Sequence, residues 1–195
     1  VDCSSYTELL LADAMGFSGK DIMFSSNVTS AKEYQLARKL GAIINLDDIS
    51  HIDFLAENGG IPEDICLRFN PGGDFRLGTR VMGDPWDAKY GLTPQQMPVA
   101  INRLKELGAK RFGVHAFLAS NTTDNTYYPT LAKLLFELVV GLSQECDAEF
   151  FMVNLSGGIG IPYEPGQERA NLAEIGAAVE VAFDETLKKA GMGDV

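Results

Sequence analysis

A glycine-rich segment, Asn154-Leu155-Ser156-Gly157-Gly158-Ile159-Gly160, directly follows an apolar stretch and is the sharpest candidate for a binding loop. Glycine lets the backbone approach a ligand closely, and successive free N–H groups can surround an anion such as a phosphate. The pattern is not GxGxxG and no acidic partner for a ribose follows it, which argues against a dinucleotide. A tight turn that requires positive φ explains the glycines equally well.

A second candidate segment is Gly113-Val114-His115-Ala116-Phe117-Leu118-Ala119-Ser120-Asn121. It places an imidazole and an aromatic ring on one face of a strand, with a hydroxyl and an amide just beyond the strand end. A planar, phosphorylated cofactor needs a ring to stack on and donors for its phosphate, and Ser120 would be one such donor. Taken singly, His115 is better explained as a hydrogen-bonded core residue and Phe117 as packing. Their combination with the glycine loop favours a cofactor site.

Metal and hydrolase chemistry have weak support. The chain has two histidines, and His51 falls in a predicted helix, so no carboxylate–histidine spacing forms a ligand set and we expect no metal site. There is also no GxSxG motif of a serine hydrolase.

The composition restricts the class of protein further. The chain has 195 residues, of which 46% are hydrophobic, and this suits one folded domain. A net charge of −11 argues against nucleic-acid or membrane partners, because both require basic patches. No apolar run reaches the roughly 18 residues of a membrane helix, and no secretory signal opens the chain. Cys3, Cys66 and Cys146 form no CxxC motif, which predicts reduced thiols and a cytoplasmic location.

The elements that must position the two segments alternate between strands and helices. This alternation predicts parallel strands joined by helical crossovers. A Ser30/Glu33 capping box opens one helix, and Thr93 followed by Pro94 opens another that ends at Gly108. The other helices are predicted over 5–15, 49–57, 127–144 and 171–190, and the strands over 1–4, 21–26, 42–46, 65–70, 111–117 and 150–155.

Polar residues recur on one face of these strands, near their carboxyl ends. Asn45 shares a face with Asp47, and Arg68 shares one with Asn70, while the opposite parity is apolar. Strands covered on both faces by helices would be apolar throughout, so this pattern favours a barrel lumen. The expected fold class is therefore α/β, a (β/α)8 TIM-type barrel of which about six β/α units are present. The aperiodic stretch 70–93 is expected to be a functional or mobile loop.

On these motifs the chain resembles the pyridoxal-phosphate-dependent, alanine-racemase-like barrel family (fold type III), and within it the diaminopimelate decarboxylases. The resemblance extends through most of the chain, and its last two motifs are the specific ones. The matching segments are 1–9 (strand and S-x-x-E-L), Arg68-Phe69-Asn70-Pro71 (R-x-N-P), Lys89-Tyr90-Gly91 (K-F-G), 115–121 (H-x-H-x-G-S-Q) and 156–160 (G-G-G-x-G).

The resemblance implies a set of cofactor-binding residues. Ser120, Gly157 and Gly158 would bind the phosphate of pyridoxal 5'-phosphate, with His115 nearby. Phe117 stands where the family has a second histidine that stacks on the pyridine ring; a phenyl ring can stack but cannot hydrogen-bond or titrate. Asp2 matches an acidic position close to the cofactor lysine.

Other family motifs are missing. No Y-x-x-K-A-N strand supplies a Schiff-base lysine, so no catalytic residue is assigned in this chain. Glu164-Pro165-Gly166-Gln167 looks like the family's E-P-G-R motif but lacks the Arg and the surrounding apolar strand. We therefore expect residues 1–195 to be a partial pyridoxal-phosphate-binding barrel domain, an internal fragment without the first strand and the C-terminal β-domain.

The expected parent enzyme is a homodimer that converts meso-diaminopimelate to L-lysine and carbon dioxide, whereas the fragment itself is inactive. Three alternatives stay open. One is a sister enzyme acting on carboxynorspermidine or another basic amino acid. Another is a catalytically dead partial barrel that binds a partner. The third is an unrelated barrel enzyme that binds a sugar phosphate in the glycine loop.

Overall fold

The computed structural model describes residues 1–73 and 90–195. Its centre is a six-stranded parallel sheet in which each strand pairs with the next one along the chain, in the order β1-β2-β3-β4-β5-β6. This order is that of a barrel wall, and it confirms the predicted α/β architecture. The strands are β1 (Asp2–Cys3), β2 (Met23–Ser26), β3 (Ile43–Leu46), β4 (Asp64–Arg68), β5 (Arg111–His115) and β6 (Glu149–Asn154).

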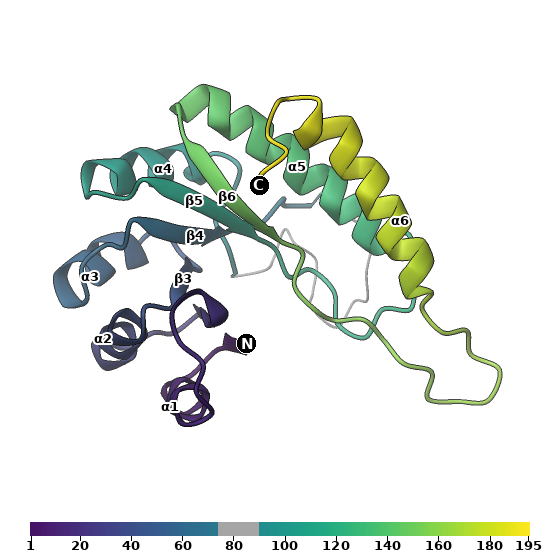
Figure 1. Ribbon diagram of the computed structural model, residues 1–195, viewed down its shortest axis with the longest axis horizontal. Coiled ribbons are helices and arrows are strands. Elements are labelled where there is room, and N and C mark those ends of the chain that lie inside the picture. The colour runs from purple at the N-terminus through teal and green to yellow at the C-terminus, as the bar shows by residue number, and fades with distance from the viewer. Residues whose placement is uncertain (74–89) are drawn as a thin grey trace.

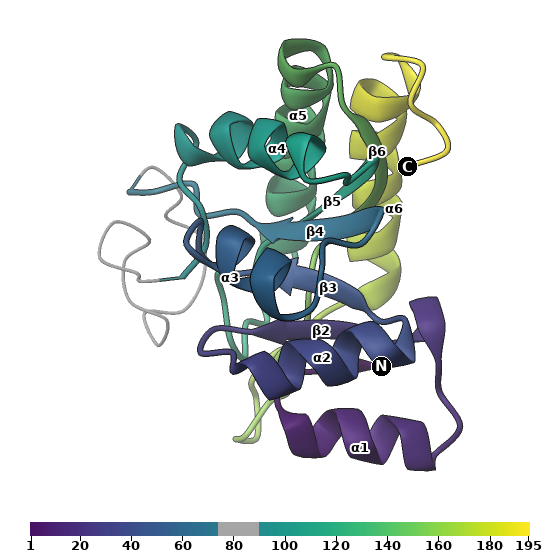
Figure 2. The ribbon, with the colours of Figure 1, turned by 90° about the vertical axis from the view of Figure 1, so that its left-hand side faces the viewer.

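Helices connect the strands and cover one face of the curved sheet (Figure 1). Seen from outside the helical layer, α2, α3 and α4 lie in front of the strands (Figure 2). The final helix, α6, packs on α5 and continues into a π-helical turn at Asp184–Lys188, so the helix predicted to reach residue 190 is not regular throughout. The helices are α1 (Tyr6–Ala14), α2 (Ala31–Leu40), α3 (His51–Asn58), α4 (Gln96–Glu106), α5 (Tyr127–Cys146) and α6 (Leu172–Phe183).

The two faces of the sheet differ in polarity, as the sequence pattern predicts. Ile44 and Val114 point into the large apolar core beneath the helices. On the other face Asn45, Arg68 and His115 are buried polar residues, and Arg68 and His115 are direct partners in the register of β4 and β5. The polar face is therefore the inner face of an incomplete barrel.

The two helix starts predicted from capping motifs differ in outcome. At α2 the Ser30/Glu33 capping box is present, as predicted. At α4 the regular helix begins at Gln96 rather than at Pro94, because Pro98 has no N–H to donate to the Pro94 carbonyl. Thr93 still caps this turn: its hydroxyl accepts a hydrogen bond from the Gln96 N–H at 3.3 Å, and the Gln96 side chain accepts one from the Thr93 N–H at 3.0 Å.

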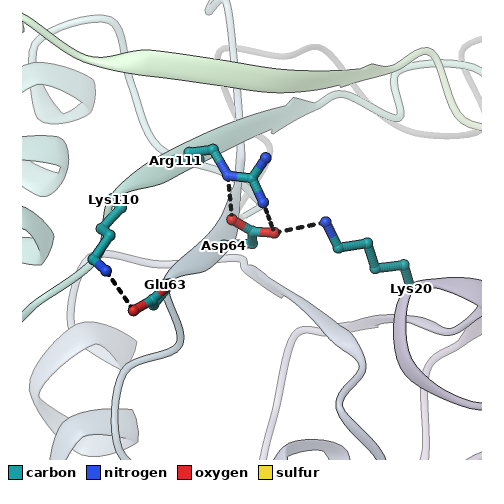
Figure 3. Close-up of polar contacts among 5 residues, drawn as sticks. All are labelled: Lys20, Glu63, Asp64, Lys110 and Arg111. Carbon is teal, nitrogen blue, oxygen red and sulfur yellow. Dashed lines mark hydrogen bonds and ion pairs between the residues drawn. The ribbon is translucent and has the colours of Figure 1, made fainter.

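A charged cluster ties the amino-terminal ends of the strands together (Figure 3). Asp64, at the start of β4, accepts two hydrogen bonds from Arg111 on β5 and forms an ion pair with Lys20. These contacts are 2.6–3.0 Å long. Lys20 precedes β2, so its contact with Asp64 spans the start of β3. Both cations also lie over the ring of Phe151 on β6, at 5.7–5.9 Å from its centroid. The cluster therefore connects β4, β5 and β6 with the turn that precedes β2.

Phe151 reaches this position through an irregularity in β6. The register between β5 and β6 shifts at Phe112/Gly113, so that Phe150 pairs with Phe112 while Met152 pairs with Gly113. The extra residue is Phe151, and both it and Met152 pack against the small apolar cluster of Met23, Ile43 and Cys66. Such a bulge bends the strand and increases its twist.

The aperiodic stretch 70–93 is described only at its ends. These ends pair with each other: the Asn70 N–H donates to Leu92 O at 2.9 Å, and the Leu92 N–H donates to Arg68 O at 2.7 Å. Lys89 of the predicted K-F-G motif lies outside the described residues. Among residues 1–73 and 90–195, no helix is long and apolar enough to cross a bilayer.

Candidate functional site

A cavity of about 440 Å³ lies at the carboxyl ends of the strands, on the inner face of the sheet. In barrels of this architecture the carboxyl ends of the strands carry the active site. Five of the six residues predicted from sequence line the cavity: Asp2, His115, Phe117, Gly157 and Gly158. The remaining lining residues are Ser4, Ser25, Asn27, Arg68, Tyr90 and Ser156.

Ser120 is the sixth predicted residue, and it does not line this cavity. It is partly buried and belongs to the segment after β5 that lies beside the glycine loop. Its proposed role in phosphate binding stays a prediction.

The glycine loop after β6 is paired with the segment after β5. The Thr122 N–H donates to Gly158 O at 2.9 Å, and the Gly160 N–H donates to Thr122 O at 2.7 Å. Gly158 has φ of +102°, and a Cβ there would collide with the Ala119 carbonyl oxygen. A Cβ on Gly160 would lie 2.7 Å from the Asn121 carbonyl oxygen. Close packing of two backbones therefore explains these two glycines by itself.

Gly157 differs from both neighbouring glycines. The space around its Cα is open, and its carbonyl accepts a hydrogen bond from the Tyr128 hydroxyl at 2.9 Å. Within residues 1–73 and 90–195, the N–H groups of Gly157 and Gly158 have no acceptor. Two adjacent free N–H groups at the wall of a cavity are what an anion such as a phosphate requires.

His115 is buried on the inner face, and its Nδ1 has no hydrogen-bond partner in the described structure. Burial and the positive charge of Arg68 lower the pKa of His115 to about 4. The imidazole is therefore neutral at physiological pH. A neutral ring with an unpartnered nitrogen beside a cavity can exchange a hydrogen bond with a ligand.

Arg68 is the only cationic residue in the cavity lining among residues 1–73 and 90–195. Its Nη1 donates to Asp47 Oδ1 at 2.7 Å, and its Nη2 donates to the Phe117 carbonyl at 3.3 Å. The guanidinium also lies over the ring of Tyr90, 4.9 Å from the centroid. Neither Arg68 nor Tyr90 is among the cofactor-binding residues predicted from sequence, although Arg68 shares the inner-face parity that the sequence revealed.

Asp2 lies on the opposite side of the cavity from the glycine loop. Its Oδ1 accepts a hydrogen bond from the Ser25 hydroxyl on the neighbouring strand. Burial raises the pKa of Asp2, and the Ser25 hydrogen bond opposes that rise. This pair adds a carboxylate and a hydroxyl to the lining of the cavity.

The lining residues fit a planar, phosphorylated cofactor. Phe117 offers a ring, Gly157 and Gly158 offer N–H groups, and His115 offers an unpartnered nitrogen. Among residues 1–73 and 90–195, no lysine lines the cavity. In the same described ranges there is no group of three His, Cys, Asp or Glu that could hold a metal ion.

The chain belongs to a family of pyridoxal-dependent decarboxylases, whose pyridoxal-binding domain it matches. The family described as "Pyridoxal-dependent decarboxylase, pyridoxal binding domain" matches residues 1–194. Its cofactor is pyridoxal phosphate. Membership leaves the sugar-phosphate alternative without support.

Among curated proteins, the chain is similar to the diaminopimelate decarboxylase of Thermoplasma acidophilum, at 29% identity over 94% of this chain and 45% of that protein. It is equally similar to Protein TabA of Pseudomonas amygdali pv. tabaci, at 29% identity over 95% of this chain and 43% of that protein. The chain thus spans less than half the length of these relatives.

Solved structures share the fold. The diaminopimelate decarboxylase of M. jannaschii in co-complex with L-lysine superimposes with a TM-score of 0.86 at 24% identity, over 97% of this chain and 45% of that one. The Helicobacter pylori enzyme complexed with L-lysine gives 0.82 at 22% identity, over 93% and 47%. These similarities confirm the predicted partial barrel of fold type III.

Proposed function

We propose that this chain carries the cofactor cradle of a pyridoxal-phosphate-dependent decarboxylase whose substrate is a basic amino acid. The reaction of the intact enzyme is the removal of one carboxylate from meso-diaminopimelate, which yields L-lysine and carbon dioxide in lysine biosynthesis. The observation that carries the proposal is the meeting of Gly157, Gly158, Phe117 and His115 at one cavity. The named relatives that are diaminopimelate decarboxylases favour this substrate.

Each cavity residue has a distinct part in holding the cofactor. The N–H groups of Gly157 and Gly158 bind the phosphate, assisted by Ser120 from the adjoining segment. Phe117 would supply a ring for the pyridine to stack on, and the neutral His115 would supply a hydrogen-bonding group. Asp2 and Ser25, which are hydrogen-bonded to each other, line the same cavity. Pyridoxal phosphate, when bound, supplies the electron sink that accepts the electron pair released as carbon dioxide leaves.

The chain by itself is proposed to bind the cofactor without catalysing decarboxylation. Within residues 1–73 and 90–195 no lysine lines the cavity, and we propose that the chain holds the cofactor without a covalent bond. The remaining groups of the reaction belong to the intact protein, which we propose to be a cytoplasmic homodimer. Residues 1–195 form its partial barrel domain.

Titration of the chain with pyridoxal phosphate, followed by tryptophan and cofactor fluorescence, tests the cradle. We expect reversible, saturable binding, with pyridoxal lacking the phosphate binding at least tenfold more weakly. Equal affinity for the two compounds would contradict a phosphate site. Borohydride reduction followed by peptide mapping tests the covalent step: a single specifically modified lysine would overturn the proposed inactivity.

A partner-binding partial barrel is the second candidate, and the surface of α6 favours it. This helix is rich in apolar residues, yet Ile175 is its only buried residue, and Leu172 and Val181 are exposed. Sedimentation of the chain over a range of concentrations separates the two candidates. Self-association without any affinity for pyridoxal phosphate would favour the binding module.

A further inference from the structure

Arg68 connects three chain segments that meet at the cavity. It projects from β4 onto the inner face and is almost completely buried. Its guanidinium contacts the Asp47 carboxylate just after β3, the Phe117 carbonyl just after β5, and the face of Tyr90. No other described residue makes polar contacts to both the β3 and the β5 ends of this cavity.

Asp47 fixes the guanidinium and also holds the chain that carries Tyr90. Its carboxylate accepts from Arg68 at 2.7 Å, and its backbone carbonyl accepts from the Gly91 N–H at 2.9 Å. Gly91 has φ of +86°, and a Cβ there would lie 3.1 Å from the backbone of Asn70, so this approach requires glycine. Because Gly91 is held in this way, the neighbouring Tyr90 packs its ring on the Arg68 guanidinium.

Phe117 depends on this arrangement because it lies beyond the regular strand. β5 ends at His115, so the ladder of backbone hydrogen bonds does not extend to Phe117. The contact from Arg68 Nη2 to its carbonyl, at 3.3 Å, supplies a fixed point there. The side-chain ring of Phe117 lies against Gly158, where an added Cβ would be 3.2 Å from a ring carbon.

We propose that Arg68 is the positioning residue of this cavity: anchored by Asp47, it holds the Phe117 backbone so that the ring stands opposite the free N–H groups of the glycine loop. The inference rests on the proposed function, since the ring and the N–H groups are the two surfaces that would hold the cofactor. Lysine cannot replace Arg68, because one ammonium lacks the planar fork that contacts a carboxylate and a carbonyl simultaneously.

The test compares Arg68→Lys with a matched control, Arg111→Lys. Both arginines bind an aspartate from a neighbouring strand segment, but Arg111 lies at the amino-terminal ends of the strands, away from the cavity. We expect Arg68→Lys to weaken pyridoxal phosphate binding about tenfold and Arg111→Lys to leave the dissociation constant unchanged. A second variant, Asp47→Asn, keeps an acceptor for Nη1 and is expected to weaken binding by a smaller factor.

A second readout does not require any ligand. The chain has two histidines, so a His51→Asn variant distinguishes the ring signals of His51 from those of His115 in an NMR spectrum. The His51 signals then serve as an internal control. We expect nuclear Overhauser contacts between Phe117 and Gly158 in the wild type and their loss in Arg68→Lys, with the His51 signals unmoved. Unchanged contacts together with an unchanged dissociation constant would overturn the positioning role. Failure of the wild type to bind pyridoxal phosphate would instead overturn the proposed function, while the NMR comparison would still decide the role of Arg68.

Discussion

Asn154 on β6 donates a hydrogen bond from its side-chain Nδ2 to the sulfur of Met23 on β2, at 2.8 Å, although 131 residues separate them in the chain. Three strands lie between β2 and β6 in the sheet. Two side chains on such distant strands can touch only if the sheet curls so that its inner face closes on itself. The six strands therefore have the curvature of a barrel.

Asn154 also contacts the glycine loop through its side-chain oxygen, so its two contacts can be tested separately. Its Oδ1 accepts from the Ser156 N–H at 2.7 Å, at the point where Ser156 adopts φ of +57°. Asn154→Ala removes both contacts and is expected to lower the free energy of unfolding by about 1–2 kcal/mol. Asn154→Asp keeps the acceptor for Ser156 but loses the donor to Met23. We expect only Asn154→Ala to weaken pyridoxal phosphate binding; equal weakening by both variants would contradict this division.

Substitution of the two adjacent loop glycines by alanine is expected to change the stability of the chain to different extents. Gly158→Ala forces a side chain into positive φ and against the Ala119 carbonyl, so we expect a loss of about 2–3 kcal/mol in the free energy of unfolding. Gly157→Ala meets open space and is expected to change that energy by less than about 1 kcal/mol. Urea denaturation of both variants measures the difference. A Gly158→Ala variant as stable as wild type would contradict the close approach of the two backbones.

His115 predicts a pH dependence of stability. Its pKa in the folded chain is about 4, whereas an exposed histidine titrates near 6.5. Between these values the unfolded chain binds more protons, so stability is complete above pH 6.5 and falls as the pH is lowered towards 4. The loss amounts to roughly 3 kcal/mol at most. Denaturation at pH 7 and pH 5 should show this fall in the wild type and a smaller one in His115→Gln.

The charged cluster at the other end of the strands predicts a contrast between two aspartates. Asp64 is largely buried and forms ion pairs with both Lys20 and Arg111, whereas Asp53 forms an ion pair with Arg103 on the surface. We expect Asp64→Asn to lower the free energy of unfolding by about 1–3 kcal/mol and Asp53→Asn by less than about 0.5 kcal/mol. High salt should reduce the small effect further. Equal effects of the two substitutions would show that the cluster adds no more stability than a surface ion pair.

Acid should weaken the same cluster. Burial raises the pKa of Asp64, but hydrogen bonds from Lys20 and Arg111 outweigh it, and the net shift is downward. Its contribution to stability is therefore present at neutral pH and is lost as the pH falls through the lowered pKa. The wild type and Asp64→Asn should converge in stability in strong acid. Parallel curves down to pH 2 would contradict the lowered pKa.

Periodicity and capping predicted most of the fold, because alternating polarity and Ser30/Glu33 are local signals. The inner-face parity of Asn45 and Arg68 was visible for the same reason. The bulge at Phe151 was not, since an apolar strand with one extra residue has the same composition as one without. The start of α4 moved because of Pro98, four residues past Pro94, which the capping pattern does not include.

The site was predictable where a motif specified it and not where packing did. His115, Phe117, Gly157 and Gly158 stand out by residue type and by their place after strands. Ser25, Asn27 and Tyr90 line the cavity only because β2 and the segment after residue 89 come close to β5 in space. Ser120 satisfied the motif, yet it lies outside the lining of the cavity.

The pairing of Thr122 with Gly158 and Gly160 has a consequence for how a ligand would bind. The loop after β6 is already fixed by its neighbour, and Tyr128 holds the Gly157 carbonyl from behind. The N–H groups of Gly157 and Gly158 are thus preorganised, so little conformational entropy would be lost on association. Stopped-flow association should then show a rate that rises linearly with ligand concentration, without a plateau from a preceding loop rearrangement.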